Sequence, residues 1–139
     1  PVPTVVAARY VRSSRFYRGD LITERIADAR TLAMRIAALD LYDEDWRSIG
    51  QLVARFHRAG LDHADLNAHN ILQGADGRWW MIDFDRGRLR ERGLWCDANL
   101  VRLRRSILKV GDSLPQRQFD ERDWSHLLAG YRDTLSVSP

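Results

Sequence analysis

A short polar segment near the middle of the chain carries the residues best suited to chemistry. His63, Asp65 and Asn70 lie within eight residues, and an acidic triplet, Asp83-Phe84-Asp85, begins thirteen residues after Asn70. Two apolar runs, NILQ and RWWMIDF, flank Gly-Ala-Asp-Gly between the two sets, which is a hairpin signature. Because a hairpin folds the chain back on itself, we expect Asp83 to lie beside Asn70.

The groups that would meet at the end of this hairpin suit a magnesium ion. Mg²⁺ prefers hard oxygen ligands, and it usually takes one or two carboxylates from the protein together with phosphate oxygens. Asn70 and Asp83 are the expected ligands, and Asp85 is a candidate further ligand for the metal or for water. Asp65 would lie nearby, free to orient a hydroxyl group.

The elements that must position this loop are predicted to be mixed. We expect two strands first, then two helices, the hairpin and two further helices, which is an α+β order rather than an alternating βαβ order. The expected strands cover residues 1–11 and Asp20–Ile26, with residues 12–19 as a loop between them, and the expected helices cover Thr31–Leu39, Glu44–Ala59, Leu94–Val110 and Asp120–Leu135.

Helical periodicity also predicts which side chains face the core. In the second helix, Asp43 is a plausible N-cap and Gly60 a plausible stop. Trp79 and Trp80 alternate in a strand, so one should face the core, and core packing is favoured over base stacking. The residues expected to face inward from the helices are Trp46, Ile49, Val53, Phe56, Leu100, Leu103, Ile107, Trp124, Leu127, Leu128 and Tyr131.

The bulk composition narrows the class of protein. The chain has 139 residues, 45% of them hydrophobic and 29% charged, which suits one folded domain or one lobe of a larger one. Cys96 is the only cysteine, so an intrachain disulfide is excluded and a cysteine-based metal site is disfavoured. The sequence has neither an apolar run long enough to cross a bilayer nor a signal-peptide pattern.

Positive charge is unevenly distributed. The net charge is +3, and eight basic residues stand against two acidic ones between Arg86 and Lys109. Such an excess suggests anionic partners, namely phosphates, acidic sugars, an anionic membrane surface or nucleic acid. A solvated surface of an arginine-rich protein is the alternative. The same two alternatives, a membrane surface or water, apply to Arg102, Arg105 and Lys109, which share one helix face. Water is slightly favoured for these three residues.

The residues of these motifs resemble those of a known family. His63 to Asn70 has the spacing H-x-D-L-x-x-x-N of the kinase catalytic loop, and Asp83-Phe84-Asp85 stands where protein kinases carry D-F-G. HRAGLDHADLNAHNIL, WWMIDFDRGRLR and WCDANLVRLRRSILK are similar to the 3-deoxy-D-manno-octulosonic acid (Kdo) kinases of Gram-negative bacteria. The resemblance implies a protein-kinase-like fold, with remnant strands and a hinge over residues 1–26 and a mostly helical C-terminal lobe over residues 27–139.

The resemblance also implies a role for each matching residue. Asp65 would orient the acceptor hydroxyl and take its proton, while Asn70 and Asp83 would hold Mg²⁺ against the ATP phosphates. His63 would brace the loop. The remaining expected site residues are Asp85 as an accessory ligand, the backbone of Glu24 and Ile26 for adenine, and Arg86, Arg88 and Arg90 for the acceptor.

The activity implied is phosphorylation of a hydroxyl of the Kdo sugar on a lipid A precursor, in lipopolysaccharide core biosynthesis, using ATP and Mg²⁺. It implies a cytoplasmic protein, peripheral at the inner face of the inner membrane, with contact to an anionic membrane surface as a further expectation. Nucleic acid is not expected as a partner. The sequence carries no signal for the oligomeric state.

The chain also departs from the kinase pattern. A working kinase needs a loop over the phosphates and an upstream lysine, yet no glycine-rich motif precedes residue 60 and Lys109 is the only lysine. We therefore expect an incomplete kinase whose N-terminal lobe is largely missing and which is inactive alone. Its first 20 residues should be poorly ordered or paired with another copy.

Several alternatives stay open beside this hypothesis. An aminoglycoside or other small-molecule kinase shares the loop motif, although the basic segment argues against a cationic acceptor. A non-catalytic kinase-like module fits the missing lysine but leaves Asp65, Asn70 and Asp83 without a purpose. Asp65 and Asp83 could also be a loop cap and a turn residue. A zinc site from His57, His63 and His69 is disfavoured, because the spacing is not that of a helical metal-binding pair.

Overall fold

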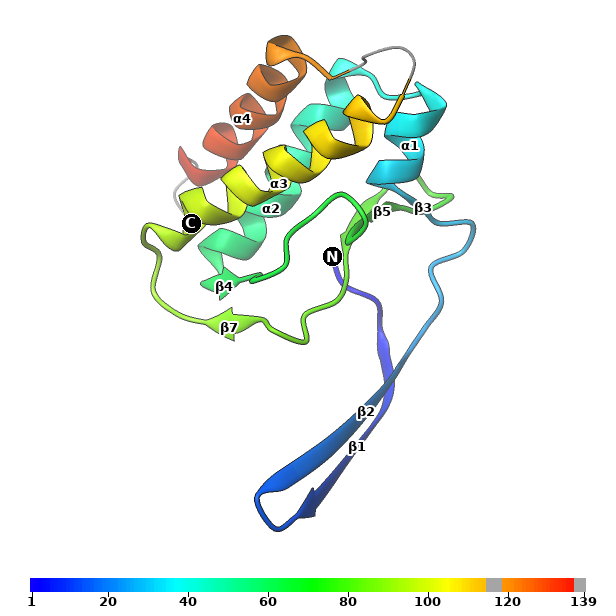
Figure 1. Cartoon of the computed structure of the whole chain (residues 1–139), viewed down its shortest axis with the longest axis vertical. Coiled ribbons are helices and arrows are strands. Elements are labelled where there is room, and N and C mark those ends of the chain that lie inside the picture. Colours follow the sequence, from blue (N-terminus) through cyan, green and yellow to red (C-terminus); the bar gives the residue numbers. More distant parts are fainter. Residues whose placement is uncertain (115–118, 137–139) are drawn as a thin grey trace.

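The computed structural model describes residues 1–114 and 119–136. Within these residues the chain is α+β, with four helices and small antiparallel sheets, as the sequence predicts. The helices gather at one end of the molecule, and a long two-stranded hairpin extends from the other end (Figure 1). None of the described helices is long and apolar enough to cross a membrane.

The hairpin is formed by β1 (Val5–Ser13) and β2 (Phe16–Thr23), which pair antiparallel from Ser13 opposite Phe16 to Val5 opposite Thr23. Its turn contains Ser14 in the left-handed region, at φ 53°. The prediction of a loop over residues 12–19 is wrong, because β1 continues to Ser13 and β2 begins at Phe16, which leaves only two residues for the turn. The two strands pair with each other, in place of the expected disorder, while pairing with another copy stays a prediction.

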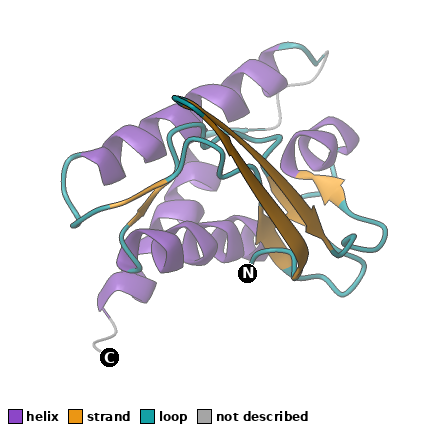
Figure 2. Cartoon of the chain, turned by 90° about the horizontal axis from the view of Figure 1, so that it is seen from below, coloured by secondary structure: helices purple, strands orange, loops and turns teal. Residues whose placement is uncertain are grey.

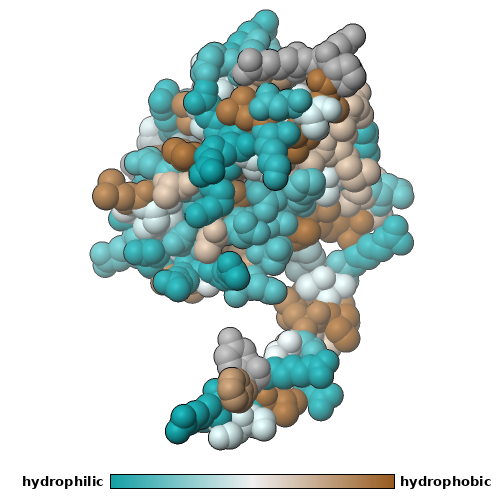
Figure 3. Space-filling view, viewed as in Figure 1, coloured by the Kyte–Doolittle hydropathy of each residue, from teal (hydrophilic) through white to brown (hydrophobic). Residues whose placement is uncertain are grey.

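Both strands of this hairpin are solvent-exposed. Every residue of β1 is exposed, and among the apolar side chains Phe16 is 80% and Leu21 64% accessible. From below, the two strands form a separate ribbon with the helices behind it (Figure 2). In the space-filling view the hairpin stands clear of the helical body (Figure 3). Its stability therefore comes from the ladder and cross-strand pairs, with no contribution from a buried core.

The core of the body forms around α2 (Asp43–Arg58). Trp46, Ile49 and Val53 are at most 2% exposed, and Phe56 is half-buried, so the predicted stripe is confirmed. The helix begins after Tyr42, whose backbone N–H donates to the Asp45 carboxylate at 3.0 Å. Asp43 is therefore the first helical residue, whereas the sequence predicted it as the N-cap.

Two glycines allow α2 and α4 (Glu121–Ser136) to pack closely. A Cβ atom at Gly50 would lie 1.9 Å from the Leu127 carbonyl oxygen, and one at Gly130 would lie 2.1 Å from the Arg47 carbonyl oxygen. Neither position has room for a side chain. The remaining predicted core residues of α3 (Trp95–Asp112) and α4 are buried or half-buried, namely Leu100, Leu103, Ile107, Trp124, Leu127, Leu128 and Tyr131.

The hairpin predicted from Gly-Ala-Asp-Gly is present. β5 (Ile71–Gln73) pairs antiparallel with β6 (Trp79–Met81), and β3 (Arg30–Thr31) joins the other edge of β5. Trp79 is 6% exposed and packs in the core, while Trp80 on the opposite face is half-buried. Core packing is therefore the role of Trp79.

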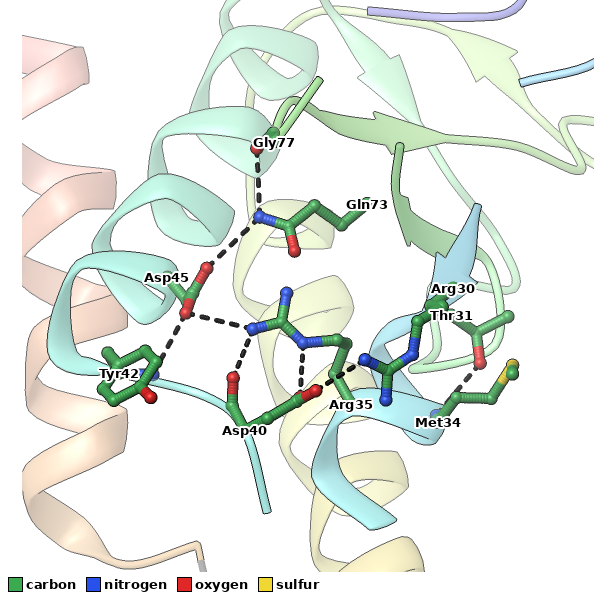
Figure 4. Close-up of polar contacts among 9 residues, drawn as sticks. All are labelled: Arg30, Thr31, Met34, Arg35, Asp40, Tyr42, Asp45, Gln73 and Gly77. Carbon is green, nitrogen blue, oxygen red and sulfur yellow. Dashed lines mark hydrogen bonds and ion pairs between the residues drawn. The ribbon is translucent and has the colours of Figure 1, made fainter. Parts of the chain in front are cut away.

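A polar network fixes this hairpin to α1 (Leu32–Ala38) and α2 (Figure 4). Arg35 donates to the Asp40 carboxylate and to Asp45 Oδ2, the latter at 3.5 Å. Gln73 Nε2 donates to Asp45 Oδ1 at 3.3 Å and to the Gly77 carbonyl at 3.0 Å. Because Asp45 receives both Arg35 and Gln73, the start of α2 and the β5–β6 turn are held in one fixed relation.

Candidate active site

The candidate loop joins two short strands. It lies between β4 (Leu61–Asp62) and β5, and β4 pairs antiparallel with β7 (Arg88–Leu89), which follows the acidic triplet. Gly60, at φ 76°, ends the preceding helix as predicted, since glycine adopts this conformation without steric cost. The β4–β7 pair places the start of the loop beside the segment after Asp85.

His63 braces the loop from inside. The residue is 2% exposed, its Nε2 lies 2.9 Å from the Ile82 carbonyl, and its ring packs 5.0 Å from that of Phe84. The Asp65 backbone N–H donates to His63 Nδ1 at 3.3 Å. Since Nδ1 accepts, Nε2 carries the proton and donates to Ile82, so one neutral imidazole links the loop to the strand end that leads to the triplet.

The rest of the loop is held by its own polar groups. Asn67 Oδ1 accepts from the backbone N–H groups of His69 and Asn70, at 2.8 and 3.2 Å. Ala68 is fixed from outside, because its N–H donates to Ser106 Oγ on α3 and its carbonyl accepts from Ala33 on α1, each at 3.0 Å. The loop backbone is therefore anchored to two helices.

The hairpin brings Asn70 and Asp83 together, as the sequence predicts. The Ile82 backbone N–H donates to the Asn70 carbonyl at 3.0 Å. Asn70 Nδ2 lies 3.0 Å from the Asp65 carbonyl and 3.5 Å from Asp83 Oδ2. Asn70 is 8% exposed, whereas Asp65 and Asp83 are both exposed to solvent. The buried amide of Asn70 therefore contacts the backbone of Asp65 and the exposed carboxylate of Asp83.

This donor set fits Mg²⁺. The amide nitrogen of Asn70 is already engaged, and no described residue donates to its Oδ1, which leaves that oxygen for a cation. Asp83 supplies a carboxylate from a residue at φ 65°, a left-handed conformation that aspartate tolerates better than most side chains. Among the described residues no three His, Cys, Asp or Glu side chains form a metal site, so phosphate and water oxygens would have to complete the coordination.

A cavity borders the loop on the side of the triplet. Its volume is about 660 Å³, and its lining residues are Asp62, Ala64, Asp85, Arg86, Gly87 and Arg88. Two of the three arginines expected to bind the acceptor therefore line it. The third, Arg90, instead donates from Nη1 to Asp62 Oδ2 at 3.2 Å. Sequence reasoning missed Asp62, because a strand of two residues leaves no periodic signal.

The expected adenine-binding segment follows β2 directly. The Glu24 backbone N–H donates to the Thr4 carbonyl at 2.8 Å, so that donor is occupied. The Glu24 carbonyl and the Ile26 N–H have no hydrogen bond within the described residues. Both residues line a cavity of about 260 Å³, together with Trp80 and the β5–β6 turn. The strand predicted over Asp20–Ile26 ends at Thr23, which leaves these two backbones outside the ladder.

A buried polar cluster behind the site was not predicted from the sequence. His57 is 1% exposed, with Nδ1 2.8 Å from the Tyr131 hydroxyl and Nε2 3.4 Å from Asn99 Nδ2. Asn99 also donates to Asp62 Oδ1 at 3.1 Å and accepts from Arg102 at 3.2 Å. Burial lowers the pKa of His57 to about 4 and raises that of Tyr131 to about 12. His57 and His63 are thus both engaged in protein hydrogen bonds.

A buried histidine braces an H-x-D-L-x-x-x-N loop, and an asparagine is turned toward the first acidic residue of D-F-D, which is the arrangement typical of phosphotransferases of the kinase class. Family comparison identifies the group within this class. Residues 1–131 match the model of the lipopolysaccharide kinase (Kdo/WaaP) family, and the chain belongs to that family.

Curated proteins that are similar to the chain share one name. The chain is 48% identical over 132 residues to a protein of Xanthomonas axonopodis pv. citri (strain 306) named 3-deoxy-D-manno-octulosonic acid kinase. A protein of Xylella fastidiosa (strain M12) with the same name is 46% identical over 134 residues. Each alignment covers 94% of this chain and 52% of the relative, so the chain spans about half the length of the curated relatives it matches.

Proposed function

We propose that the chain takes part in the ATP- and Mg²⁺-dependent phosphorylation of a hydroxyl of the Kdo sugar on a lipid A precursor. In this proposal residues 27–139 form the C-terminal lobe of a protein-kinase-like fold, and residues 1–26 supply strands and a hinge. The observation that carries the proposal is that the Asn70 amide contacts both the backbone carbonyl of Asp65 and the carboxylate of Asp83. The name of the relatives supplies the acceptor.

Each residue has a role that follows from its surroundings. The exposed carboxylate of Asp65 orients the acceptor hydroxyl and takes its proton as the hydroxyl oxygen bonds to the γ-phosphorus and ADP leaves. Asn70 Oδ1 and the Asp83 carboxylate hold the metal ion, which neutralises charge on the phosphates when bound. Asp85 is an accessory ligand to metal or water. The Glu24 carbonyl and the Ile26 N–H bind adenine.

The acceptor and the location follow from the same proposal. A Kdo sugar carries a carboxylate, which suits arginines such as Arg86 and Arg88 beside the loop. Because the acceptor is part of a lipid, the protein acts as a peripheral protein on the cytoplasmic face of the inner membrane. Exposed basic residues on α3, such as Arg105 and Lys109, are available to an anionic surface.

The test is a phosphorylation assay by mass spectrometry. The chain by itself, the protein that carries this chain and the relative from Xanthomonas axonopodis pv. citri are incubated in parallel with Mg²⁺-ATP and a Kdo-capped lipid A precursor. The relative serves as the positive control, and the chain by itself is expected to give no product. We expect one added phosphate from the protein that carries this chain, its loss in Asp65→Ala, and normal activity in Asp112→Asn. Asp112 is exposed at the end of α3, and its side chain has no hydrogen bond or ion pair among the described residues.

Other outcomes of this assay would favour one of the alternative functions. Phosphate transfer by the relative but not by the protein that carries this chain would remove the proposal. Nucleotide binding without transfer would then favour a non-catalytic module. Transfer to an aminoglycoside but not to the Kdo-capped precursor would favour the small-molecule kinase, and would contradict the acceptor proposed above.

A further inference from the structure

The candidate loop is held near both of its ends by one helix. α3 runs alongside the loop that joins β4 to β5, and two of its polar side chains contact that segment (Figure 1). Asn99 Nδ2 donates to Asp62 Oδ1 at 3.1 Å, directly before the loop begins. Ser106 Oγ accepts from the Ala68 backbone N–H at 3.0 Å, near the end of the loop. Asp65 stands three residues from each of these contacts.

The two α3 side chains lie on one face of the helix. They are seven residues apart, which is close to two helical turns. Leu103, four residues after Asn99, belongs to the same face and is fully buried in the core. Asn99 is 1% exposed and Ser106 is half-buried. Because the buried leucine fixes this face of α3, the helix presents both polar side chains to the loop at once.

The orientation of the Asn99 amide is fixed by its other contacts. Its Nδ2 also lies 3.4 Å from His57 Nε2, and its Oδ1 accepts from Arg102 Nη1 at 3.2 Å. A flipped amide would place its oxygen against the Asp62 carboxylate and its nitrogen against the Arg102 guanidinium. Both contacts would then be repulsive. The protein therefore keeps Asn99 Nδ2 directed at Asp62.

Asp62 passes this restraint to the strands beside the loop. Its side chain is 13% exposed, and its Oδ2 accepts from Arg90 Nη1 at 3.2 Å. In the β4–β7 ladder Asp62 stands opposite Arg88. One carboxylate thus connects α3 to β4 and to the segment that follows the acidic triplet, and the loop starts at the next residue.

The backbone of Asp65 is restrained, whereas its carboxylate is not. The Asp65 N–H donates to His63 Nδ1 at 3.3 Å. The Asp65 carbonyl accepts from Asn67 Nδ2 and Asn70 Nδ2, each at 3.0 Å. The Asp65 carboxylate is exposed and has no hydrogen bond or ion pair with any residue in the described part of the chain. Its position therefore follows from the loop backbone, which α3 holds on both sides.

We propose that Asn99 and Ser106 are positioning residues, which hold the loop so that the Asp65 carboxylate meets the acceptor hydroxyl. A displacement of about 1 Å at a reacting group can lower a rate about 100-fold, even when its cause is remote from the chemistry. The inference rests on the proposed function for the role of Asp65 as base. The restraint on the loop can nevertheless be measured without phosphoryl transfer.

The first experiment measures transfer kinetics in the protein that carries this chain, with Mg²⁺-ATP and the Kdo-capped lipid A precursor. Asn99→Ala and Ser106→Ala should each lower kcat at least about tenfold, while the Kd of a fluorescent ATP analogue changes less than about threefold. Ser106→Thr keeps a hydroxyl acceptor and should restore most of kcat. Ser48→Ala is the matched control, because the Ser48 side chain is half-buried on α2 and has no hydrogen bond within the described residues.

The same substitutions in an Asp65→Asn background separate positioning from damage to the fold. If Asn99 and Ser106 act through Asp65, each should add less than about twofold to the loss of residual rate that Asp65→Asn causes alone. A further tenfold loss in that background would contradict the proposal. An unchanged kcat in both single variants that retain Asp65 would also contradict it, and would leave the proposed function intact.

Hydrogen exchange tests the restraint itself, with no substrate present. The amides of residues 63–70 should exchange at least about tenfold faster in Asn99→Ala and in Ser106→Ala than in wild type, and at an unchanged rate in Ser48→Ala. Unchanged exchange in the two α3 variants would overturn the restraint, whether or not the wild type is active. Faster exchange in a protein that forms no product would leave the restraint standing and remove the proposed function.

Discussion

Asn70 Nδ2 lies 3.5 Å from Asp83 Oδ2, across a hairpin that separates the two residues by thirteen positions. The same nitrogen donates to the Asp65 carbonyl. The amide is therefore oriented by the protein before any ligand arrives, with its oxygen left over. A preorganised pair of oxygen ligands is what a metal–nucleotide complex requires of this loop.

Asp83→Asn should raise the Mg²⁺ concentration required for nucleotide binding by more than about tenfold, because the substitution removes the carboxylate that contacts Asn70. Asparagine also tolerates the φ of 65°, so the fold should be unchanged. The measurement is a Mg²⁺ titration of fluorescent ATP-analogue binding. Coincident titration curves for wild type and variant would exclude Asp83 as a ligand. Asp83→Ala should in addition lose about 1 kcal/mol of stability to backbone strain.

Adding one methyl group between α2 and α4 should destabilise the protein. Gly130→Ala places a Cβ atom 2.1 Å from a backbone oxygen, so the helices must separate at a cost of about 3 kcal/mol, in spite of the better helix propensity of alanine. Gly111→Ala in α3 is the matched control, since its Cβ would meet no atom within 4 Å, and it should gain up to about 1 kcal/mol. The free energy of unfolding of both variants is measured in urea. A change of the same sign in the two variants would contradict the close packing.

Acid should destabilise the protein through His57. Its pKa is lowered from 6.5 to about 4 by burial and by Arg92, while Asp62 and Asp97 oppose this shift. The unfolded chain therefore binds more protons than the folded chain between these two values, so stability is complete above about pH 6.5 and falls as the pH drops toward 4. The loss is on the order of 3 kcal/mol.

The check for His57 is a pair of urea-unfolding series at pH 5 and pH 7. His57→Gln, which cannot titrate and can still form a hydrogen bond with the Tyr131 hydroxyl, should show a smaller difference between the two pH values than wild type. Carboxylates titrate in both proteins, so the comparison isolates the histidine. An identical pH dependence in wild type and variant would show that His57 is not the group responsible.

Arg35 should contribute more to stability than an exposed arginine of equal charge. Its side chain is 12% exposed and pairs with Asp40 and Asp45. Arg35→Ala therefore leaves the partly buried Asp45 carboxylate without its cation and Asp40 with Arg30 alone, at a cost of about 2 kcal/mol. Arg47 also pairs with a carboxylate, but that pair is 38% and 61% exposed, and Arg47→Ala should cost less than about 1 kcal/mol. Thermal unfolding of both variants gives the comparison, and equal losses would contradict the ranking.

The sequence predicted those parts of the fold that have a strong period or a strong turn. Trp46, Ile49 and Val53 recur at helical spacing and are buried, because an amphipathic helix of this length must cover its apolar face. The turn at Gly74 to Gly77 determined the β5–β6 hairpin, and the hairpin placed Asp83 beside Asn70. The centre of the candidate site was therefore predictable.

Features that depend on long-range contacts were not predictable. β4 and β7 have two residues each and exist only because the folded body brings Asp62 opposite Arg88. Nothing in the sequence separates Arg90 from Arg86 until Asp62 is seen to bind Arg90. The β1–β2 strands are exposed on both faces, so they lack the alternation by which a half-buried strand is recognised, and residues 12–19 were interpreted as a loop for this reason.

Because the β1–β2 hairpin is exposed, we expect it to open with a smaller free energy than the helical body needs to unfold. A two-stranded ribbon without a packed face is marginally stable in water, so its amide hydrogens should exchange with solvent almost as fast as those of an unfolded peptide. Amides of α2, at the centre of the core, should exchange only when the whole body unfolds. A stability measured from fluorescence of the core tryptophans would therefore say nothing about the segment that leads into Glu24 and Ile26.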